Sequence, residues 1–348
     1  MNPKIEKTAR VALSGDGTER AEADCLLSLD GEELYDLFYW ANRIRERFKG
    51  NAVVSCSIIS AKQGRCGEDC KFCSQAARHN TGIAEFALMD KAKIVEAAKA
   101  AAGVGSQCFG IVTSGRAVIT SHEQAMIYDA VTAVAAMGRM DCGASLGILT
   151  PEFAKRLVDC GLKRYNHNLE TSERFFPNIC TTHSYRERVN TVRIAMDAGL
   201  RVCCGGIFGL GESWTDRLDL AFALREFGVR EVPLNFLNPI RGTPLQNAQR
   251  LKPMEILKII ALFRFILPDA DLKTCGGREV NLRDLQSWMF YAGANGTMIG
   301  NYLTTTGNPP ERDLQMIEDL GLKLTVNKKE SVRQPLTINH QPSSRECL

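Results

Sequence analysis

The sequence predicts an α/β protein, specifically a (β/α)8 TIM-type barrel, from three observations. Short apolar runs alternate with longer amphipathic stretches along most of the chain. Eight such runs and at least seven helical stretches follow one another over roughly 250 residues, the length typical of this barrel. The chain has 348 residues, so one domain of this size fits within it.

The expected strands are apolar runs, each short enough to cross a barrel once. They lie near residues 52–59, 107–113, 141–148, 163–169, 200–207, 231–237, 271–278 and 297–301. The expected helices lie near residues 90–102, 121–138, 151–160, 185–198, 214–227, 253–267 and 281–291. Capping signals at Ser121, at Thr150 before Pro151, and at Ser184 indicate where three of them begin.

The barrel is expected to occupy residues 50–322. Residues 1–49 form an N-terminal segment, in which residues 1–25 are polar and are expected to be irregular. Asp30 to Lys49 follows as an amphipathic helix, because its apolar residues recur at helical spacing. After residue 322 the composition turns polar, so residues 323–348 are predicted to be a loosely ordered tail.

Composition excludes several classes of protein. The net charge is +3, with 43 basic and 40 acidic side chains well mixed, which gives no electrostatic case for nucleic acid. No apolar run reaches the roughly 18 residues of a membrane span, and we find no signal-peptide core. The 13 cysteines are odd in number and accompany no secretory signal. We therefore expect a cytoplasmic protein that uses cysteines for metals.

Three cysteines in one loop, Cys66, Cys70 and Cys73, carry the clearest chemical signal. Thiolates favour zinc, copper(I) or iron–sulfur clusters. A structural zinc site usually closes with four ligands, often as two C-x2-C pairs, and this sequence has no second pair. Three thiolates on a 4Fe-4S cluster leave one iron open for a substrate or cofactor. A zinc knuckle and a ferredoxin-like electron carrier are the simpler alternatives.

The fourth expected strand carries polar residues on one face. Asn166, Asn168 and Glu170 share that face, and Tyr165, His167 and Leu169 share the other. Buried polar groups need partners, so we expect the first three to meet a polar ligand inside the barrel. His167 faces the helices on this count and is expected to be a satisfied core histidine.

The cysteine loop is similar to the signature of radical S-adenosylmethionine (SAM) enzymes, which have C-x3-C-x2-C with an aromatic residue before the third cysteine, here Phe72. The strings GRCGEDCKFCSQAARHNTGI and YNHNLETS resemble the biotin synthase family in particular. The similarity extends from about Val53 to Leu322. It implies that Cys66, Cys70 and Cys73 hold a 4Fe-4S cluster whose open iron chelates SAM.

The family also carries an auxiliary cluster in the barrel, typically 2Fe-2S, held by three cysteines and one arginine. The matching positions here are Cys108, Cys142, Cys203 and Arg278. Strand alternation points Cys108 into the barrel. Cys203 and Cys204 are neighbours, so only one of them can point inward, and we expect it to be Cys203. Cys142 is less clear, because Gly143, Ser145 and Gly147 are the natural lumen set of that strand, which would point Cys142 outward unless Gly143 makes a bulge. Cys56 and Cys275 are alternative ligands, so we hypothesise that this auxiliary cluster is 2Fe-2S or larger.

The resemblance assigns further contacts. It implies that Asn166, Asn168 and Glu170 hold dethiobiotin, with Glu170 standing where the family more usually has Asp. Four residues are expected to contact SAM: Phe72, Gly206, Glu212 and Asn235.

The implied function is that of a transferase: radical SAM sulfur insertion that converts dethiobiotin to biotin, the last step of biotin biosynthesis. An electron donor such as flavodoxin or ferredoxin and a homodimeric state are expected with it. One rival is a radical SAM enzyme that abstracts hydrogen without inserting sulfur. The other is a non-enzymatic iron–sulfur carrier or zinc-binding module.

Overall fold

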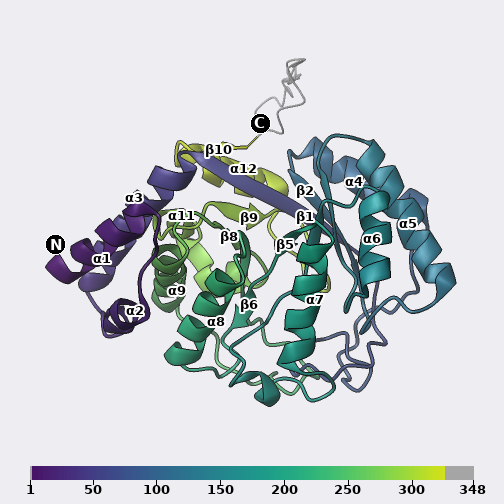
Figure 1. Cartoon of the computed structure of the whole chain (residues 1–348), viewed down its shortest axis with the longest axis horizontal. Helices are drawn as coiled ribbons and strands as arrows, with labels where there is room; N and C mark the ends of the chain where they lie inside the picture. The colour runs from purple at the N-terminus through teal and green to yellow at the C-terminus, as the bar shows by residue number, and fades with distance from the viewer. Residues whose placement is uncertain (1, 326–348) are drawn as a thin grey trace, which may run out of the picture.

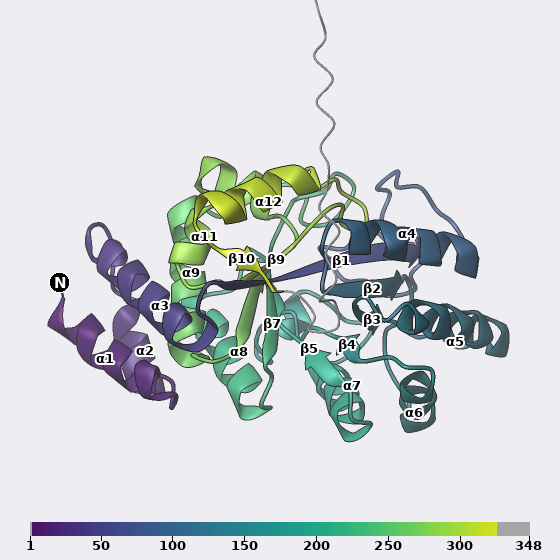
Figure 2. The same cartoon turned by 90° about the horizontal axis from the view of Figure 1, so that it is seen from above.

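The computed structural model describes residues 2–325, in which parallel strands close into a barrel with helices around its outside (Figures 1 and 2). The barrel closes because β1 pairs with both β2 and β9. β5 and β6 both pair with β7, so these two short strands together take the place of one of the eight strands of the barrel. The barrel strands are β1 (Ala52–Lys62), β2 (Cys108–Thr113), β3 (Asp141–Ser145), β4 (Arg164–Asn166), β5 (Arg201–Cys203), β6 (Gly206–Phe208), β7 (Glu231–Phe236), β8 (Asp271–Thr274) and β9 (Gly296–Met298).

The helices cover the outer face of the barrel, and their buried apolar side chains form the core between the two layers. They confirm the predicted alternation of strand and helix. The expected helix at 281–291 is in fact broken, because Arg283 takes a positive φ of 54° between two short helices. The helices along the barrel are α4 (Lys91–Gly103), α5 (Ser121–Ala136), α6 (Pro151–Asp159), α7 (Tyr185–Asp197), α8 (Trp214–Glu226), α9 (Pro253–Ile266), α10 (Arg278–Leu282), α11 (Trp288–Tyr291) and α12 (Pro310–Asp319), with the 3-10 turns η1 (Phe176–Asn178) and η2 (Arg283–Leu285).

The N-terminal segment is more ordered than expected. The prediction that residues 1–25 are irregular is wrong, because α1 (Pro3–Ser14) and α2 (Arg20–Leu26) are helices that precede α3 (Glu33–Lys49). α1 packs against α3 and α9, as Figure 1 shows. Its buried residues are Ile5, Thr8, Ala9 and Ala12. This spacing is helical, but small alanine side chains gave it a weak apolar signal.

The capping signals are largely confirmed. Thr150 and Ser184 are N-caps, and their side chains accept hydrogen bonds from the amides of Phe153 and Glu187. For α5 the predicted cap was wrong by one residue. Thr120, not Ser121, has the extended backbone of an N-cap, and its hydroxyl accepts from the Glu123 amide at 3.2 Å.

The beginning of the predicted tail forms one short strand, so this part of it is not loosely ordered. β10 (Lys323–Leu324) pairs with Ala52 and Val53 at the start of β1. The rest of that predicted tail lies outside the described residues. Among residues 2–325, no helix is both long and apolar enough to cross a membrane.

Candidate active site

The barrel encloses a cavity of about 390 Å³. Phe72 and Cys73 line it from the cysteine loop, and strand residues line it from the barrel interior, or lumen. Tyr302, in the loop after β9, borders it as well. A cavity that joins a thiol-bearing loop to a polar lumen can hold a ligand away from water.

Backbone hydrogen bonds hold the cysteine loop in its fold. The amide of Cys73 donates to the carbonyl of Cys70 at 2.9 Å, and the carbonyl of Cys66 accepts from the Ala77 amide at 2.8 Å. Burial, together with the nearby thiol of Cys66, raises the pKa of Cys73 to about 11. Such thiols ionise when a metal binds them.

The spacing of these three thiols bears on what they can hold. Two sulfurs on one tetrahedral ion lie about 3.8 Å apart, given Zn–S bonds of about 2.3 Å. Among residues 2–325, the three loop sulfurs do not form a group whose ligand atoms all lie within 4.8 Å of one another. The arrangement therefore suits a cluster of several metals better than a lone zinc ion.

Four further cysteines face the lumen. Cys56, Cys108, Cys203 and Cys275 all line the cavity, which confirms the inward orientation predicted for Cys108 and Cys203. Cys56 and Cys108 are register partners on β1 and β2. A hydrogen bond with Cys275 lowers the pKa of Cys56, while burial raises that of Cys203 to about 12.

The two other expected ligands of the auxiliary cluster are not in the lumen. Cys142 is buried in the apolar core outside the barrel wall, and its neighbour Gly143 faces Cys108 instead. Arg278 is fully buried but does not line the cavity, and it donates to Asp313 at 2.5 Å and to Gln286 at 2.8 Å. The lumen positions that the resemblance implied for Cys142 and Arg278 are therefore wrong, whereas the outward direction that strand alternation gave Cys142 is confirmed.

Charged residues accompany the lumen thiols, and sequence reasoning missed them. Arg164 and Lys273 line the cavity, and both are paired with Glu231, at 2.8 Å and 2.6 Å. The Nη1 atom of Arg164 is buried and has no hydrogen-bond partner among the described residues. An orphaned guanidinium nitrogen beside four thiols fits an anionic group such as an iron–sulfur cluster. Strand alternation could have found Arg164 beside Asn166, and Lys273 beside Cys275.

The polar strand face is where it was predicted. Asn166, Asn168 and Glu170 all line the cavity, while Tyr165 and Leu169 are in the outer core. His167 is buried on that outer side, but the prediction that it is satisfied is wrong. Its Nε2 atom has no partner among the described residues.

Glu170 is held in an unusual conformation at the cavity wall. It has a positive φ of 70°, and its carboxylate accepts from Arg188 at 2.9 Å and from Asn168 at 3.3 Å. Burial raises the pKa of Glu170, and Arg188 opposes that shift. A fixed acceptor with a positive φ is typical of a binding site.

Two of the four residues expected to contact SAM line the cavity, namely Phe72 and Asn235. Gly206 and Glu212 do not. The Glu212 carboxylate accepts from the amides of Gly209 and Leu210 and pairs with Arg217 at 2.7 Å, so it shapes its own loop. At Gly206 a side chain would meet the carbonyl oxygen of Glu170 at 2.5 Å, so close packing requires this glycine.

Comparison with known proteins decides the family. Residues 61–224 match the radical SAM superfamily, and residues 233–323 match the Biotin and Thiamin Synthesis associated domain. The chain is 53% identical to a biotin synthase of Geobacter sulfurreducens over 91% of its own length and 96% of that protein. It is 52% identical to a biotin synthase of Geotalea daltonii, over 93% of this chain and 98% of that protein.

The chain belongs to the biotin synthase family. It is therefore a radical SAM enzyme of biotin biosynthesis. Solved structures agree on the fold. Methylornithine synthase superposes with a TM-score of 0.81 at 20% identity, covering 91% of this chain and 97% of that one. HydG, a maturase of the [FeFe]-hydrogenase, superposes with a TM-score of 0.79 at 17% identity, covering 93% of this chain and 75% of that one.

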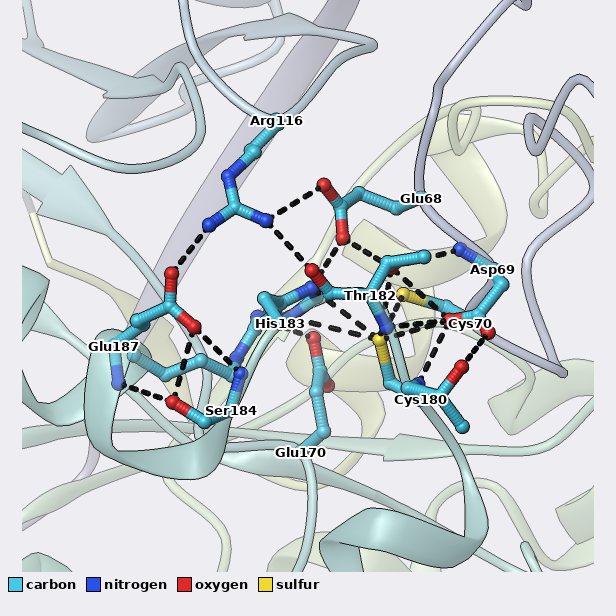
Figure 3. A network of polar contacts seen from close by, with 12 residues as sticks. Glu68, Asp69, Cys70, Arg116, Glu170, Cys180, Thr182, His183, Ser184 and Glu187 are labelled. Atoms are coloured by element: carbon cyan, nitrogen blue, oxygen red, sulfur yellow. Dashed lines mark hydrogen bonds and ion pairs between the residues drawn. The ribbon is translucent and has the colours of Figure 1, made fainter.

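Beside the loop expected to hold the SAM-binding cluster lies a polar network that sequence reasoning missed (Figure 3). Cys180, which the sequence analysis did not single out, lies 3.8 Å from Cys70, sulfur to sulfur. His183 lies beside Cys180 and pairs with Glu68 at 2.5 Å. The C-x2-H spacing of Cys180 and His183 was visible, but only the fold brings it to Cys70.

Proposed function

We propose that this chain converts dethiobiotin to biotin by radical sulfur insertion. The observation that carries the proposal is one cavity lined both by Cys73 of the cysteine loop and by four lumen cysteines. Family membership gives the substrate. A hydrogen-abstracting maturation enzyme would not need the second set, and a simple electron carrier would not need the cavity.

Cys66, Cys70 and Cys73 would hold a 4Fe-4S cluster, and the auxiliary cluster would bind in the lumen. Bound there, the first cluster and SAM would supply a 5′-deoxyadenosyl radical, and the auxiliary cluster would supply the sulfur. The chain itself positions the substrate between these sources and keeps water out. Phe72 and Asn235 line the part of the cavity we assign to SAM.

For the auxiliary cluster we propose Cys56, Cys108, Cys203 and Cys275 as ligands, instead of a set with Cys142 and Arg278. All four line the cavity, and Arg164 and Lys273 bring positive charge beside them. Four thiols exceed what a 2Fe-2S cluster with three thiolates and an arginine requires. We therefore propose a larger cluster at this site.

Iron and sulfide analysis after anaerobic reconstitution tests the auxiliary cluster. More than six irons per chain are expected, with Mössbauer spectra that resolve two multi-iron sites. Cys275→Ala should lose the lumen signal and Cys142→Ala should keep it. Two irons in the lumen site, or its loss in Cys142→Ala alone, would contradict the assignment.

For dethiobiotin we propose contacts from Asn166, Asn168 and Glu170. Asn168 donates to Glu170 and accepts from the amide of Gly205, and Glu170 also accepts from Arg188. These contacts hold both side chains in place. The Asn166 amide has no side-chain hydrogen bond among the described residues, so it is free to bind a ligand.

We further propose an external one-electron donor such as flavodoxin or ferredoxin, a homodimeric state and a cytoplasmic location, all by analogy with the family. The activity is tested by anaerobic incubation with SAM, dethiobiotin and reductant, followed by mass detection of biotin. Biotin is expected together with 5′-deoxyadenosine. Deoxyadenosine without biotin would instead support a radical SAM enzyme that inserts no sulfur.

A further inference from the structure

We propose that Cys70, Cys180 and His183 form a binding site for a single divalent thiophilic ion, such as Zn²⁺ or Fe²⁺, in chains that carry no cluster at Cys70. The site is separate from the lumen thiols and uses only one of the three loop cysteines. It is independent of the proposed reaction, because it concerns the protein before any cluster is present.

The distances among these residues match a tetrahedral site. Among residues 2–325, their ligand atoms all lie within 4.8 Å of one another. The two sulfurs are 3.8 Å apart, the separation that two Zn–S bonds of about 2.3 Å span at a tetrahedral angle. The sulfur of Cys180 lies 3.3 Å from His183 Nδ1, close to the roughly 3.5 Å that such an ion would set.

Asp69 lies beside these three residues in the same network (Figure 3). Its Oδ1 atom is 3.2 Å from the Cys180 sulfur, but Asp69 is not in the group whose ligand atoms all lie within 4.8 Å of one another. We therefore assign the fourth position to a water molecule. Two thiolates and an imidazole, with one open position, are a donor set that suits zinc or ferrous iron.

The histidine is held by its surroundings, as metal-binding histidines usually are. Its ring packs edge-on against Phe176, with ring centroids 5.6 Å apart. Glu68 lies 2.5 Å from Nδ1, and Arg188 donates to Nε2 at 2.9 Å. Both Cys180 and His183 are buried, so little ordering remains to be done when an ion binds.

Binding changes the proton positions in a defined way. The two thiols release one proton each, the proton on His183 Nδ1 moves to Nε2, and Glu68 loses its hydrogen bond to Nδ1. Nε2 then carries the imidazole proton, so Arg188 gives up that contact. Arg188 keeps its bonds to the carbonyl of Asn168 and to Glu170, which limits the cost.

The consequence is competition for Cys70. That thiol cannot bind a lone ion with Cys180 and also serve a cluster with Cys66 and Cys73. An ion at this site would have to leave before a cluster forms.

The test uses the full-length protein, freed of metal under reducing, anaerobic conditions and titrated with Co²⁺ as a spectroscopic probe. The expected result is a tetrahedral Co²⁺ spectrum with a sulfur charge-transfer band, reversed by Zn²⁺. The lumen thiols can bind Co²⁺ as well, so the readout is the number of tetrahedral ions per chain. Cys180→Ala and His183→Ala should each lower that number by one, or weaken the site by more than about 100-fold.

Matched variants separate this site from the cluster site. Cys66→Ala and Cys73→Ala should keep the Co²⁺ site and lose the reconstituted 4Fe-4S spectrum. Cys180→Ala and His183→Ala should show the reverse, and Cys70→Ala should lose both. Circular dichroism checks that each variant is folded, and Cys180→Ser provides a second, less disruptive change.

Two results would overturn the proposal. One is a Co²⁺ stoichiometry that stays the same in folded Cys180→Ala, Cys180→Ser and His183→Ala proteins. The other is a Co²⁺ site at the loop that depends on Cys66 and Cys73, since the ion would then bind the three loop cysteines.

Discussion

At the scale of single residues, the direction of each side chain across the barrel wall decides its role. Asn166 points into the cavity and Tyr165, next to it, is wholly buried on the other side. Cys108 is inside, whereas Cys142 is outside although both lie on neighbouring strands. Residue type alone therefore does not identify a ligand in this protein.

The open amide of Asn166 yields a prediction about substrate binding. Asn166→Ala should raise the KM for dethiobiotin about tenfold, because one hydrogen bond to the substrate contributes on the order of 1 kcal/mol. Its melting temperature should change little, since that amide bonds to no described residue. Steady-state kinetics and thermal melting check this.

The control is Asn168→Ala, which should also lower stability, because Asn168 accepts from the Gly205 amide at 3.1 Å. An unchanged KM in Asn166→Ala would remove Asn166 from the binding site.

At the scale of helices and strands, capping residues and ion pairs between elements position the helices around the barrel. Capping residues define where α5, α6 and α7 begin. The ion pair between Lys49 at the end of α3 and Asp271 on β8, at 2.7 Å, joins the N-terminal helices to the barrel.

The start of α5 can be tested with two adjacent substitutions. Thr120→Ala should destabilise the protein by about 1 kcal/mol, because the Glu123 amide loses its acceptor. Ser121→Ala should have an effect within about 0.5 kcal/mol, since Ser121 is exposed and lies inside the helix. Denaturant unfolding measures both. Equal losses would mean that Ser121 shares the cap.

The Lys49–Asp271 pair predicts a pH-dependent contribution to stability. Burial raises the pKa of Asp271, but Lys49 and Asn295 outweigh it, so the pKa lies below its ordinary value of 3.8. A depressed carboxyl pKa stabilises the folded state above the unfolded pKa, and this is lost as pH falls through the folded value.

Asp271→Asn should therefore lower the melting temperature at pH 7, with a deficit that shrinks below about pH 4. The control is Asp269→Asn, whose partner Arg230 is largely exposed, and it should have little effect at either pH. A deficit for Asp271→Asn that is the same at pH 7 and pH 3.5 would show that the charge is not the cause.

At the scale of the whole molecule, the N-terminal helices and the barrel share one apolar core. Ile5, Phe38 and Ile260 belong to the same cluster of buried residues, although they lie on α1, α3 and α9. We therefore expect the N-terminal helices and the barrel to unfold together in one cooperative transition.

Ile5→Ala tests that connection. The expected loss is about 2–5 kcal/mol, because the side chain is fully buried. The loss should appear as a lower melting temperature of the main transition, followed by circular dichroism. Lys7→Ala, an exposed change on the same helix, should leave it unchanged. A separate early transition in Ile5→Ala, with the main one unmoved, would show that α1 unfolds independently.

The sequence by itself determined the barrel, the three-cysteine loop and the inward direction of Asn166, Asn168 and Glu170. These features are local, since apolar periodicity, ligand spacing and strand alternation are all set by neighbours in the chain. The tertiary structure alone decided that Cys142 and Arg278 lie outside the lumen, that Arg164 and Lys273 line it and pair with Glu231, and that Cys180 and His183 meet Cys70. The physical reason is that register and long-range packing set these positions, and a shift of one residue reverses the direction of a strand's side chains.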